Sequence, residues 1–416
     1  MSQRVPFRTG DQALVREINL SLIMNRLHRH APISRAALAE MTGLNKSTVS
    51  SLVNELIARK FVRELGAVSQ KGIGRPSVQL ELNPHAGYIV SAEIGVGFIS
   101  VICTNFTANV LWECRESIPL ELGQQLIIER ALALMNNAVE AGKSATGTQP
   151  LLGIAFGLPG IIDTRDGTLL FAPNLRWRNL PIRDILQEVF PGVPIFVDNE
   201  SNLGVLGEYF FGAAQGYDEV LYISAGIGLG GAVLHNGQLL RGVTGFAGEF
   251  GHMTLYPDGE ACNCGNRGCW ETRVSPAAMY RHIRREIERG VPTILSAIAA
   301  ADLNLMHIVN AAQAADQVAL EALERLGHDL GIGIASLVNV FNPDLVLVGG
   351  VLSQARDFIM PVVEQEIRAR ALKWSTDTVT LLPAKHGIQA CVMGGVAAVY
   401  QTMLSVPGNT HLPVPA

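Results

Sequence analysis

One histidine and three cysteines in the middle of the chain have the spacing of a metal-binding loop. They are His252, Cys262, Cys264 and Cys269, at offsets of ten, two and five residues. One imidazole and three thiolates form a ligand set that suits tetrahedral zinc. Because four protein ligands leave no open position, the sequence predicts one structural Zn²⁺ per chain. The alternative is a disulfide pair beside an unrelated histidine, which the single residue between Cys262 and Cys264 disfavours.

A second group of polar residues lies near the N-terminus, on one face of a helix expected from residue 46 onward. Apolar residues at helical spacing from Val49 to Ile57 form the opposite face, which must pack against other helices. Short hydrogen-bonding side chains and one cation suit insertion into a DNA major groove about 12 Å wide. The residues expected to contact DNA here are Asn45, Lys46, Ser47, Thr48, Ser50, Ser51 and Asn54.

Two more helices are expected to support this recognition helix. Apolar residues recur at helical spacing over 14–27 and predict a first helix of about five turns. Ser34 is placed as the N-cap of a short helix over 35–41, and a turn at 42–44 leads into the recognition helix. The order of these elements predicts a helix-turn-helix.

Two strand-like runs, 61–65 and 77–82, follow the recognition helix and predict a wing. A polar, glycine-rich loop joins them. An arginine held extended between a glycine and a proline can lie along a narrow, A·T-rich minor groove. The DNA contacts expected from this loop are Lys71, Gly74, Arg75 and Pro76.

The charge distribution supports nucleic-acid contact at the N-terminus alone. Residues 1–83 carry twelve Lys/Arg and six Asp/Glu, a net charge of +6, whereas the remainder carries −11, within an overall charge of −5. A basic N-terminal unit on an acidic body favours a DNA partner for the former and a different ligand for the latter.

The remaining residues have the composition of a compact, loop-punctuated α/β protein. The chain has 416 residues with 48% hydrophobic and 17% charged residues, so two or three domains are expected. Strand-like runs alternate with amphipathic helices twice over, which predicts two lobes with a cleft between them. No apolar run reaches the roughly 18 residues of a membrane helix, and no signal peptide is evident. We expect a cytoplasmic protein without membrane contact.

The body also contains a series of glycine- and asparagine-rich motifs in a fixed order. They are Gly157-Leu158-Pro159-Gly160, Ala172-Pro173-Asn174-Leu175, Asp198-Asn199-Glu200-Ser201-Asn202, Ser224-Ala225-Gly226-Ile227-Gly228-Leu229-Gly230-Gly231 and Val348-Gly349-Gly350. With these and the zinc segment, residues 88–395 resemble the ROK family of sugar kinases and sugar-responsive repressors. Together with the winged helix, the chain is most similar to the family's xylose-repressor branch.

The resemblance implies an actin-like, ribonuclease-H-like ATPase fold and a homodimer, with higher assemblies left open. The expected organisation is a winged helix-turn-helix over 1–84, a first lobe over 85–197 and a second lobe over 198–384 with the zinc site and the dimerisation surface. The C-terminal segment 385–416 is expected to return to the first lobe and to the DNA-binding domain.

The resemblance also implies a sugar site. Carboxylates accept paired hydrogen bonds from adjacent sugar hydroxyls, and an amide both donates and accepts. The pocket carried over from the family is acidic and lacks an evident Arg or Lys clamp, which favours a free monosaccharide over a phosphorylated one. The expected sugar-binding residues are Asn199, Glu200, Glu249, His252 and Glu271, with Asn174 and the backbone at Gly160 as further candidates.

Catalysis is not expected, because this chain departs from the family's kinase motifs at three positions. The first phosphate turn has Glu93 in place of Asp and lacks its hydroxyl residue. The second phosphate loop has Ala225 in place of Thr, and the base position holds Glu200, one methylene longer than Asp. A displacement of about 1 Å in a positioned base can cost on the order of a hundredfold in rate.

The sequence therefore predicts a transcription repressor that binds operator DNA as a dimer and is released by a free monosaccharide such as xylose or glucose. The alternative is an ATP-dependent sugar kinase of this family with a fused DNA-binding domain, since residual kinase activity and ATP binding stay open. No motif identifies the sugar, the operator sequence, the controlled genes or a regulatory protein partner.

Overall fold

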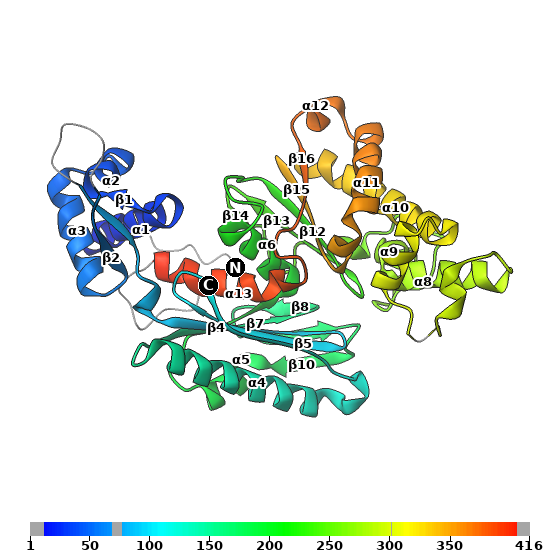
Figure 1. The fold of residues 1–416 in the computed structure, drawn as a ribbon, viewed down its shortest axis with the longest axis horizontal. Helices are drawn as coiled ribbons and strands as arrows, with labels where there is room; N and C mark the ends of the chain where they lie inside the picture. The colour runs from blue at the N-terminus through cyan, green and yellow to red at the C-terminus, as the bar shows by residue number, and fades with distance from the viewer. Residues whose placement is uncertain (1–11, 69–76, 301, 406–416) are drawn as a thin grey trace.

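A computed structural model describes residues 12–68, 77–300 and 302–405 of the chain. Figure 1 shows a small helical unit at the N-terminus, a lower lobe built on a twisted sheet, and an upper lobe that extends into a helical region. The C-terminal helix lies at the centre, where the three parts meet. This arrangement confirms the winged helix-turn-helix and the two-lobed α/β body.

The N-terminal unit has three helices and a three-stranded sheet in the order β1-β3-β2. Ser34 accepts a hydrogen bond from the amide of Ala37 and Asn45 accepts one from Thr48, so both caps occur where the sequence predicts them. The elements are α1 (Gln12–His30), β1 (Ile33–Ser34), α2 (Arg35–Thr42), α3 (Lys46–Ala58), β2 (Val62–Val68) and β3 (Ser77–Leu82).

The wing loop between β2 and β3 falls outside the described residues. The contacts expected from Lys71, Gly74, Arg75 and Pro76 therefore stay predictions. The two strands that flank the loop pair antiparallel from Val62 with Leu82 to Val68 with Ser77.

The first lobe is a five-stranded sheet in the order β11-β7-β4-β5-β6. Helix α4 packs on one face and α13 (Ala390–Ser405) packs on the other, so the central strands are buried on both sides. The elements are β4 (Tyr88–Gly95), β5 (Phe98–Asn105), β6 (Val110–Ser117), α4 (Gly123–Thr146), β7 (Leu151–Leu158), α5 (Ile182–Val189) and β11 (Ile195–Asn199). A small sheet beside it consists of β8 (Ile161–Asp163), β9 (Thr168–Ala172) and β10 (Trp177–Pro181).

The second lobe is a five-stranded sheet in the order β14-β13-β12-β15-β16. Side chains alternate between its faces: Tyr222 faces α6 and α13, whereas Ile223 packs with the core of α10 and α11. The strands are β12 (Val220–Ala225), β13 (Leu229–His235), β14 (Gln238–Leu239), β15 (Leu345–Gly350) and β16 (Thr380–Pro383). The helices are α6 (Glu200–Phe211), α7 (Glu271–Val274), α8 (Pro276–Glu288), α9 (Leu305–Gln313), α10 (Gln317–Phe341), α11 (Arg356–Arg370) and α12 (Lys373–Thr376).

Helix α13 (Ala390–Ser405) joins the three parts by packing on α6, on β4 and β7, and on α1. One continuous hydrophobic cluster runs from α1 through α13 to the inner face of the second sheet. The segment Gly387–Ser405 is long and apolar enough to cross a membrane, but 67% of its most apolar window is buried within the fold. Burial of this kind is typical of a core helix in a globular protein.

Candidate functional site

A cavity of about 490 Å³ lies between the two lobes. Side chains and backbone from both lobes line it, including the glycine-rich turn between β12 and β13. The structure brings all seven residues expected to bind sugar to this one cavity, namely Gly160, Asn174, Asn199, Glu200, Glu249, His252 and Glu271.

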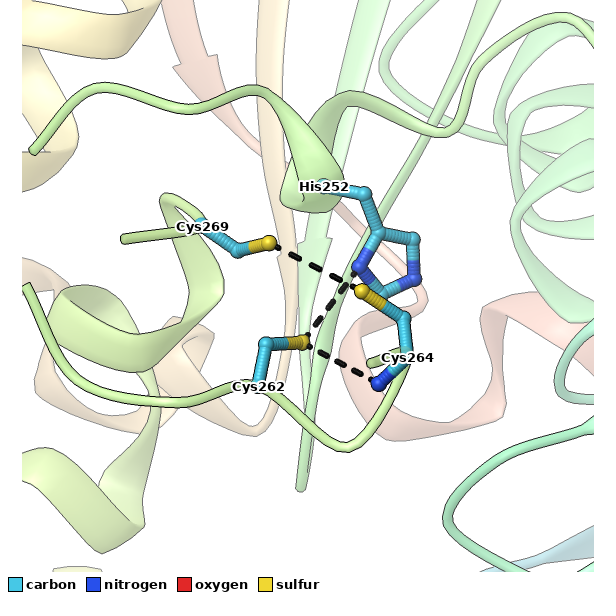
Figure 2. Close-up of side chains that lie close together, drawn as sticks. All are labelled: His252, Cys262, Cys264 and Cys269. Carbon is cyan, nitrogen blue, oxygen red and sulfur yellow. Dashed lines mark hydrogen bonds between the residues drawn. The ribbon is translucent and has the colours of Figure 1, made fainter. Parts of the chain in front are cut away.

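The four expected metal ligands converge beside the cavity (Figure 2). Their ligand atoms all lie within 4.8 Å of one another. The Sγ of Cys262 lies 3.7 Å from Nδ1 of His252, and the Sγ atoms of Cys264 and Cys269 are 3.8 Å apart. Metal–sulfur bonds of about 2.3 Å in a tetrahedron place two sulfurs roughly 3.7 Å apart. These separations fit a tetrahedral ion at the centre of the cluster.

The alternative disulfide does not form, since all six cysteines of the chain are free thiols. Cys262 donates a hydrogen bond to Oε1 of Glu271 at 2.7 Å. Burial first, and then this carboxylate, raise the pKa of the Cys262 thiol. A thiolate at this position therefore needs the compensating charge of a cation.

His252 connects the metal cluster to the cavity. Its Nδ1 faces Cys262, whereas its Nε2 lies 3.8 Å from Oε2 of Glu249 and lines the cavity side. A ligand bond at one ring nitrogen fixes the orientation of the other. The geometry allows one nitrogen for a metal and one for a ligand in the cavity.

The N-terminus of α6 positions Asn199 and Glu200 in the cavity wall. Asn199 caps the helix by accepting from the amides of Ser201 and Asn202, and its Nδ2 donates to the carbonyl of Gly160 at 3.0 Å. One N–H of the Asn199 amide stays available for a ligand. Gly160 thus acts on the site through its backbone, where its φ of +105° favours glycine.

The glycine-rich turn approaches the acidic side chains closely. A Cβ at Gly230 would lie 3.2 Å from Oε1 of Glu200, and one at Gly228 would lie 2.9 Å from Oε2 of Glu271 and 3.2 Å from Nδ2 of Asn174. Only glycine leaves these carboxylates room at the cavity wall.

Three carboxyl groups of the cavity, those of Glu93, Glu200 and Glu249, have a pKa above that of a free carboxyl. Burial, followed by the nearby carboxylates of Glu249, Glu93 and Asp198, raises the pKa of Glu200 well above its usual value. Burial raises the pKa of Glu93 to about 7, and it also raises the pKa of Glu249. A carboxyl group that keeps its proton in this way, as Glu93 does below about pH 7, donates as well as accepts hydrogen bonds.

Sequence reasoning missed Arg115, a cation in the cavity wall. Its guanidinium stacks 3.7 Å above the ring of Phe98 and donates to the carbonyl of Ile388. The expectation of an acidic pocket without an evident Arg or Lys clamp did not include this cation. Arg115 belongs to β6, which alternates between exposed and half-buried residues, and no local signal indicates which way its side chain turns.

The ring of Phe98 also fills the first glycine turn of the lobe. A Cβ at Gly95 would lie 2.1 Å from this ring, so the ring contacts the backbone directly. Phe98 and Arg115 together occupy the space next to the turn that carries Glu93.

The recognition helix α3 presents the expected polar face to solvent. Lys46, Ser47, Ser51 and Asn54 are exposed, whereas Thr48 and Ser50 are half-buried beside the apolar stripe. Arg35 donates to Oδ1 of Asn54 at 3.1 Å and pairs with Glu64 at 2.6 Å. Sequence reasoning did not single out Arg35, which adds a cation next to this face.

Comparison with known proteins gives two family matches. The sequence model of the ROK family matches residues 90–402, and that of the MarR family matches residues 21–69. The xylose repressor of Caldicellulosiruptor bescii is 35% identical over 401 residues, covering 96% of this chain and 99% of the relative. The xylose repressor of Bacillus subtilis is 34% identical over 400 residues, covering 95% and 98%. The N-acetylglucosamine repressor of Escherichia coli O157:H7 is 27% identical over 398 residues, covering 95% of each.

Solved structures give the same picture. A ROK family transcriptional regulator, a homologue of the E. coli MLC protein, is 30% identical with a TM-score of 0.80 and covers 95% of this chain and all of its own. A ROK family glucokinase from Streptomyces griseus, in complex with glucose and AMPPNP, is 29% identical with a TM-score of 0.66. It covers 74% of this chain and 98% of its own. The glucokinase match is shorter, whereas the regulator match spans nearly the whole chain.

Proposed function

Because the chain belongs to the ROK family, we propose that it is a sugar-responsive transcriptional repressor. One observation carries the proposal: the acidic interlobe cavity and a winged helix are joined in one chain by helices that contact both. The full-length relatives named above are repressors.

The cavity is the proposed monosaccharide site. Glu249 and Glu271 accept hydrogen bonds from neighbouring hydroxyls, and Glu200, with its raised pKa, donates as well as accepts. His252 offers Nε2 and Asn199 offers its free N–H. Xylose is the first candidate effector, because the xylose repressors are 34–35% identical to this chain and the N-acetylglucosamine repressor is 27% identical.

The proposed metal is a structural zinc ion held by His252, Cys262, Cys264 and Cys269. The softness of three sulfurs and one imidazole, and separations that match a tetrahedron, support zinc. When bound, zinc supplies the charge that keeps the thiolates ionised. The four residues themselves fix the loop that carries Glu249 and Glu271 to the cavity.

We do not propose catalysis. Phosphoryl transfer depends on groups placed around the transferred phosphate. In this chain the ring of Phe98 fills the first phosphate turn, and Glu93 there has a pKa raised to about 7 by burial. The competing hypothesis, a sugar kinase with a fused DNA-binding domain, predicts turnover of about 1–100 s⁻¹ in a coupled ATP assay with hexoses and pentoses.

The proposed repressor acts as a homodimer that places two winged helices on an inverted repeat. We assign the DNA-binding head to 1–84 and the lobes to 85–197 and 198–384. The segment 385–416, which is described as far as residue 405, is assigned to the first lobe and to the head. Sugar binds one arrangement of the lobes more tightly, which shifts the population towards dimers whose heads no longer match the half-site spacing.

A single experiment tests the proposal on the full chain. Operator DNA is selected from random duplexes with the purified protein, and its binding is then measured by fluorescence anisotropy against a panel of free monosaccharides. A coupling of about 1–3 kcal/mol corresponds to a five- to 150-fold loss of DNA affinity at saturating sugar. Rapid sugar phosphorylation, or DNA affinity that no sugar changes, would contradict the proposed function.

A further inference from the structure

A second, smaller pocket of about 90 Å³ lies among the helices of the second lobe. It is formed by α7, α8 and α10 together with Glu260 of the metal loop. The share of one water molecule in liquid volume is about 30 Å³, so this pocket has room for a group of a few heavy atoms. Four arginines and one histidine line it, namely Arg273, Arg281, His282, Arg285 and Arg325.

The residues that line this pocket include four arginines against two carboxylates, and Glu286 lies just outside the lining, 4.0 Å from His282. Its two carboxylates are Asp329, which pairs with Arg273 at 3.0 Å, and Glu260, which Arg281 and Arg285 share at 2.7 and 3.9 Å. The hydroxyl of Tyr256 also donates a hydrogen bond to Asp329 at 2.7 Å.

Two groups in the pocket have bonding capacity to spare. Within the described part of the chain, Arg325 forms no salt bridge. The Nε2 atom of His282 is buried and has no hydrogen-bond partner among the described residues. A buried polar atom without a partner is destabilising, and a ligand that hydrogen-bonds to it removes that penalty.

From this geometry we infer that the pocket binds the phosphate group of a small ligand. A tetrahedral dianion accepts from several guanidinium groups at once, and arginine forks match its oxygens. Exposed Arg285 and Arg325 lie at the mouth, so the rest of a phosphate monoester can extend into solvent. Free phosphate and phosphate monoesters share this chemistry.

The short helix α7 links this pocket to the sugar cavity. Glu271 lines the cavity, whereas the next two residues, Thr272 and Arg273, line the phosphate pocket. Occupancy of either site constrains the same turn of helix, so phosphate binding shifts sugar affinity, and sugar shifts phosphate affinity by the same factor. This coupling rests on the proposed function, whereas phosphate binding itself does not.

Calorimetry on the full-length, zinc-loaded protein without DNA or sugar tests the site. Inorganic phosphate is expected to bind saturably at one site per chain. Arg325→Gln is expected to weaken binding at least tenfold. Arg289→Gln is the control, because this arginine is exposed like Arg325 but lies outside the pocket lining. Arg281→Gln serves as a second pocket variant, with zinc content and Tm checked because Arg281 donates to the carbonyl of Thr272.

The outcomes separate the explanations. Unsaturable binding, or equal losses in Arg325→Gln and Arg289→Gln, overturns the phosphate site. Operator affinity that falls in Arg325→Gln overturns it in favour of nucleic-acid contact. If glycerol 3-phosphate binds more tightly than inorganic phosphate, the ligand of the pocket is a phosphorylated metabolite. If it binds equally or more weakly, the ligand is free phosphate. Saturable phosphate binding that leaves the Kd for xylose unchanged rejects the coupling alone.

Discussion

Burial determines the protonation of Glu93, a carboxyl group of the cavity, at neutral pH. Glu93 is 7% exposed and its carboxyl accepts a hydrogen bond from the thiol of Cys391. The positive charge of Arg115 opposes the effect of burial, but burial is the larger cause. Ionising Glu93 in the folded protein therefore costs free energy that the unfolded chain does not incur.

Stability is expected to depend on pH through Glu93. Its pKa is 4.5 in the unfolded chain and about 7 in the folded protein, so the folded state retains a proton between these values. The free energy of unfolding then falls as pH rises from about 4.5 to 7 and levels off above, by on the order of 3 kcal/mol. Urea unfolding of Glu93→Gln and the parent chain measures this from pH 5 to 8. A difference between the two that is constant with pH would contradict the assignment.

The two carboxylates beside the metal cluster are predicted to carry the sugar response. Hydrogen bonds to charged groups contribute about 1.5–3 kcal/mol, so Glu249→Gln or Glu271→Gln should weaken sugar binding roughly ten- to 150-fold. Operator affinity without sugar should change little, because the DNA-binding face is remote from both residues. Calorimetry with xylose and anisotropy with operator DNA give the two readouts.

The control for these variants is Glu288→Gln, an exposed residue at the end of α8. It should leave both sugar and operator binding unchanged. If Glu249→Gln and Glu271→Gln release operator at the same sugar concentration as Glu288→Gln, the cavity is not the effector site.

Among the elements, the sequence predicts those with a strong local pattern. The helices of the head and their caps at Ser34 and Asn45 occur as predicted, because an apolar stripe and a cap are encoded within a few residues. Strand β13 was missed. Its Gly230 and Gly231 look like loop residues, yet they are required because Cβ atoms would meet Ser201 and Phe250 across the fold.

The residues of the candidate site could likewise be predicted only where a local sequence pattern marks them. The motif residues could be assigned from their order in the chain, since glycine, asparagine and acidic residues recur in a fixed pattern. Arg115 and Phe98 could not, because their stacking depends on the pairing of β5 with β6. The phosphate pocket could not be predicted from the sequence either, because its arginines lie on three separate helices, α7, α8 and α10.

The metal loop is an element whose order should depend on its ion. Between Met253 and Trp270 it has no helix or strand, and its backbone is held by turn hydrogen bonds and by two isolated bridges, Thr254 with Cys269 and Ala261 with Arg267. Cys264→Ser should lower zinc content, lower Tm and weaken sugar binding, because the loop also holds Glu249 and Glu271 near the cavity. Cys114→Ser, at a half-buried cysteine outside the cluster, should change none of these. Full zinc content in Cys264→Ser by mass spectrometry would contradict the ligand assignment.

Two helices run from the cavity to the DNA-binding head. Helix α6 starts at Glu200, directly after its cap Asn199 in the cavity wall, and spans about 18 Å. Helix α13 starts at Ala390, and Ala390 and Cys391 line the same wall. Their backbones touch, since a Cβ at Gly394 would lie 1.6 Å from the carbonyl oxygen of Leu203. A shift of one helix must therefore move the other.

His28 of α1 lies where both helices end. Its ring packs against Phe210, Phe211 and Tyr400 at centroid distances of 5.7, 5.9 and 5.0 Å. Burial lowers the pKa of His28 to about 4, so the ring is neutral. Its Nδ1 forms a hydrogen bond with the hydroxyl of Tyr400 at 3.1 Å.

Tyr400→Phe is predicted to weaken the link between sugar and DNA without damaging either site. It removes a hydrogen bond worth about 0.5–1.5 kcal/mol, so the factor by which sugar lowers operator affinity should fall about two- to tenfold. The Kd for xylose should stay within about twofold. Tyr217→Phe, at a half-buried tyrosine, is the control. An unchanged coupling factor in Tyr400→Phe would show that this contact does not transmit the response.

Across the whole molecule, the DNA-binding head (residues 1–84) and the rest of the chain (the body) differ in charge and are joined by one hydrophobic cluster. The head carries +6 and the remainder −11, so attraction to DNA comes from one end of an otherwise acidic chain. The hydrophobic cluster that joins them is continuous through α1, α13 and α6. The head is therefore packed on the body, and under the proposed function a change between the lobes reorients it.

DNA binding by the head should show a salt dependence set by its own cations. Each phosphate contact that is lost reduces the slope of log K against log salt by about 0.9. Lys46 is exposed at the first position of α3, so Lys46→Gln should lower that slope by about one and weaken binding to operator and random DNA alike. Lys373→Gln, on α12 of the body, should change neither quantity. Anisotropy titrations between 50 and 200 mM salt distinguish them, and equal slopes for the two variants would place DNA on a different surface.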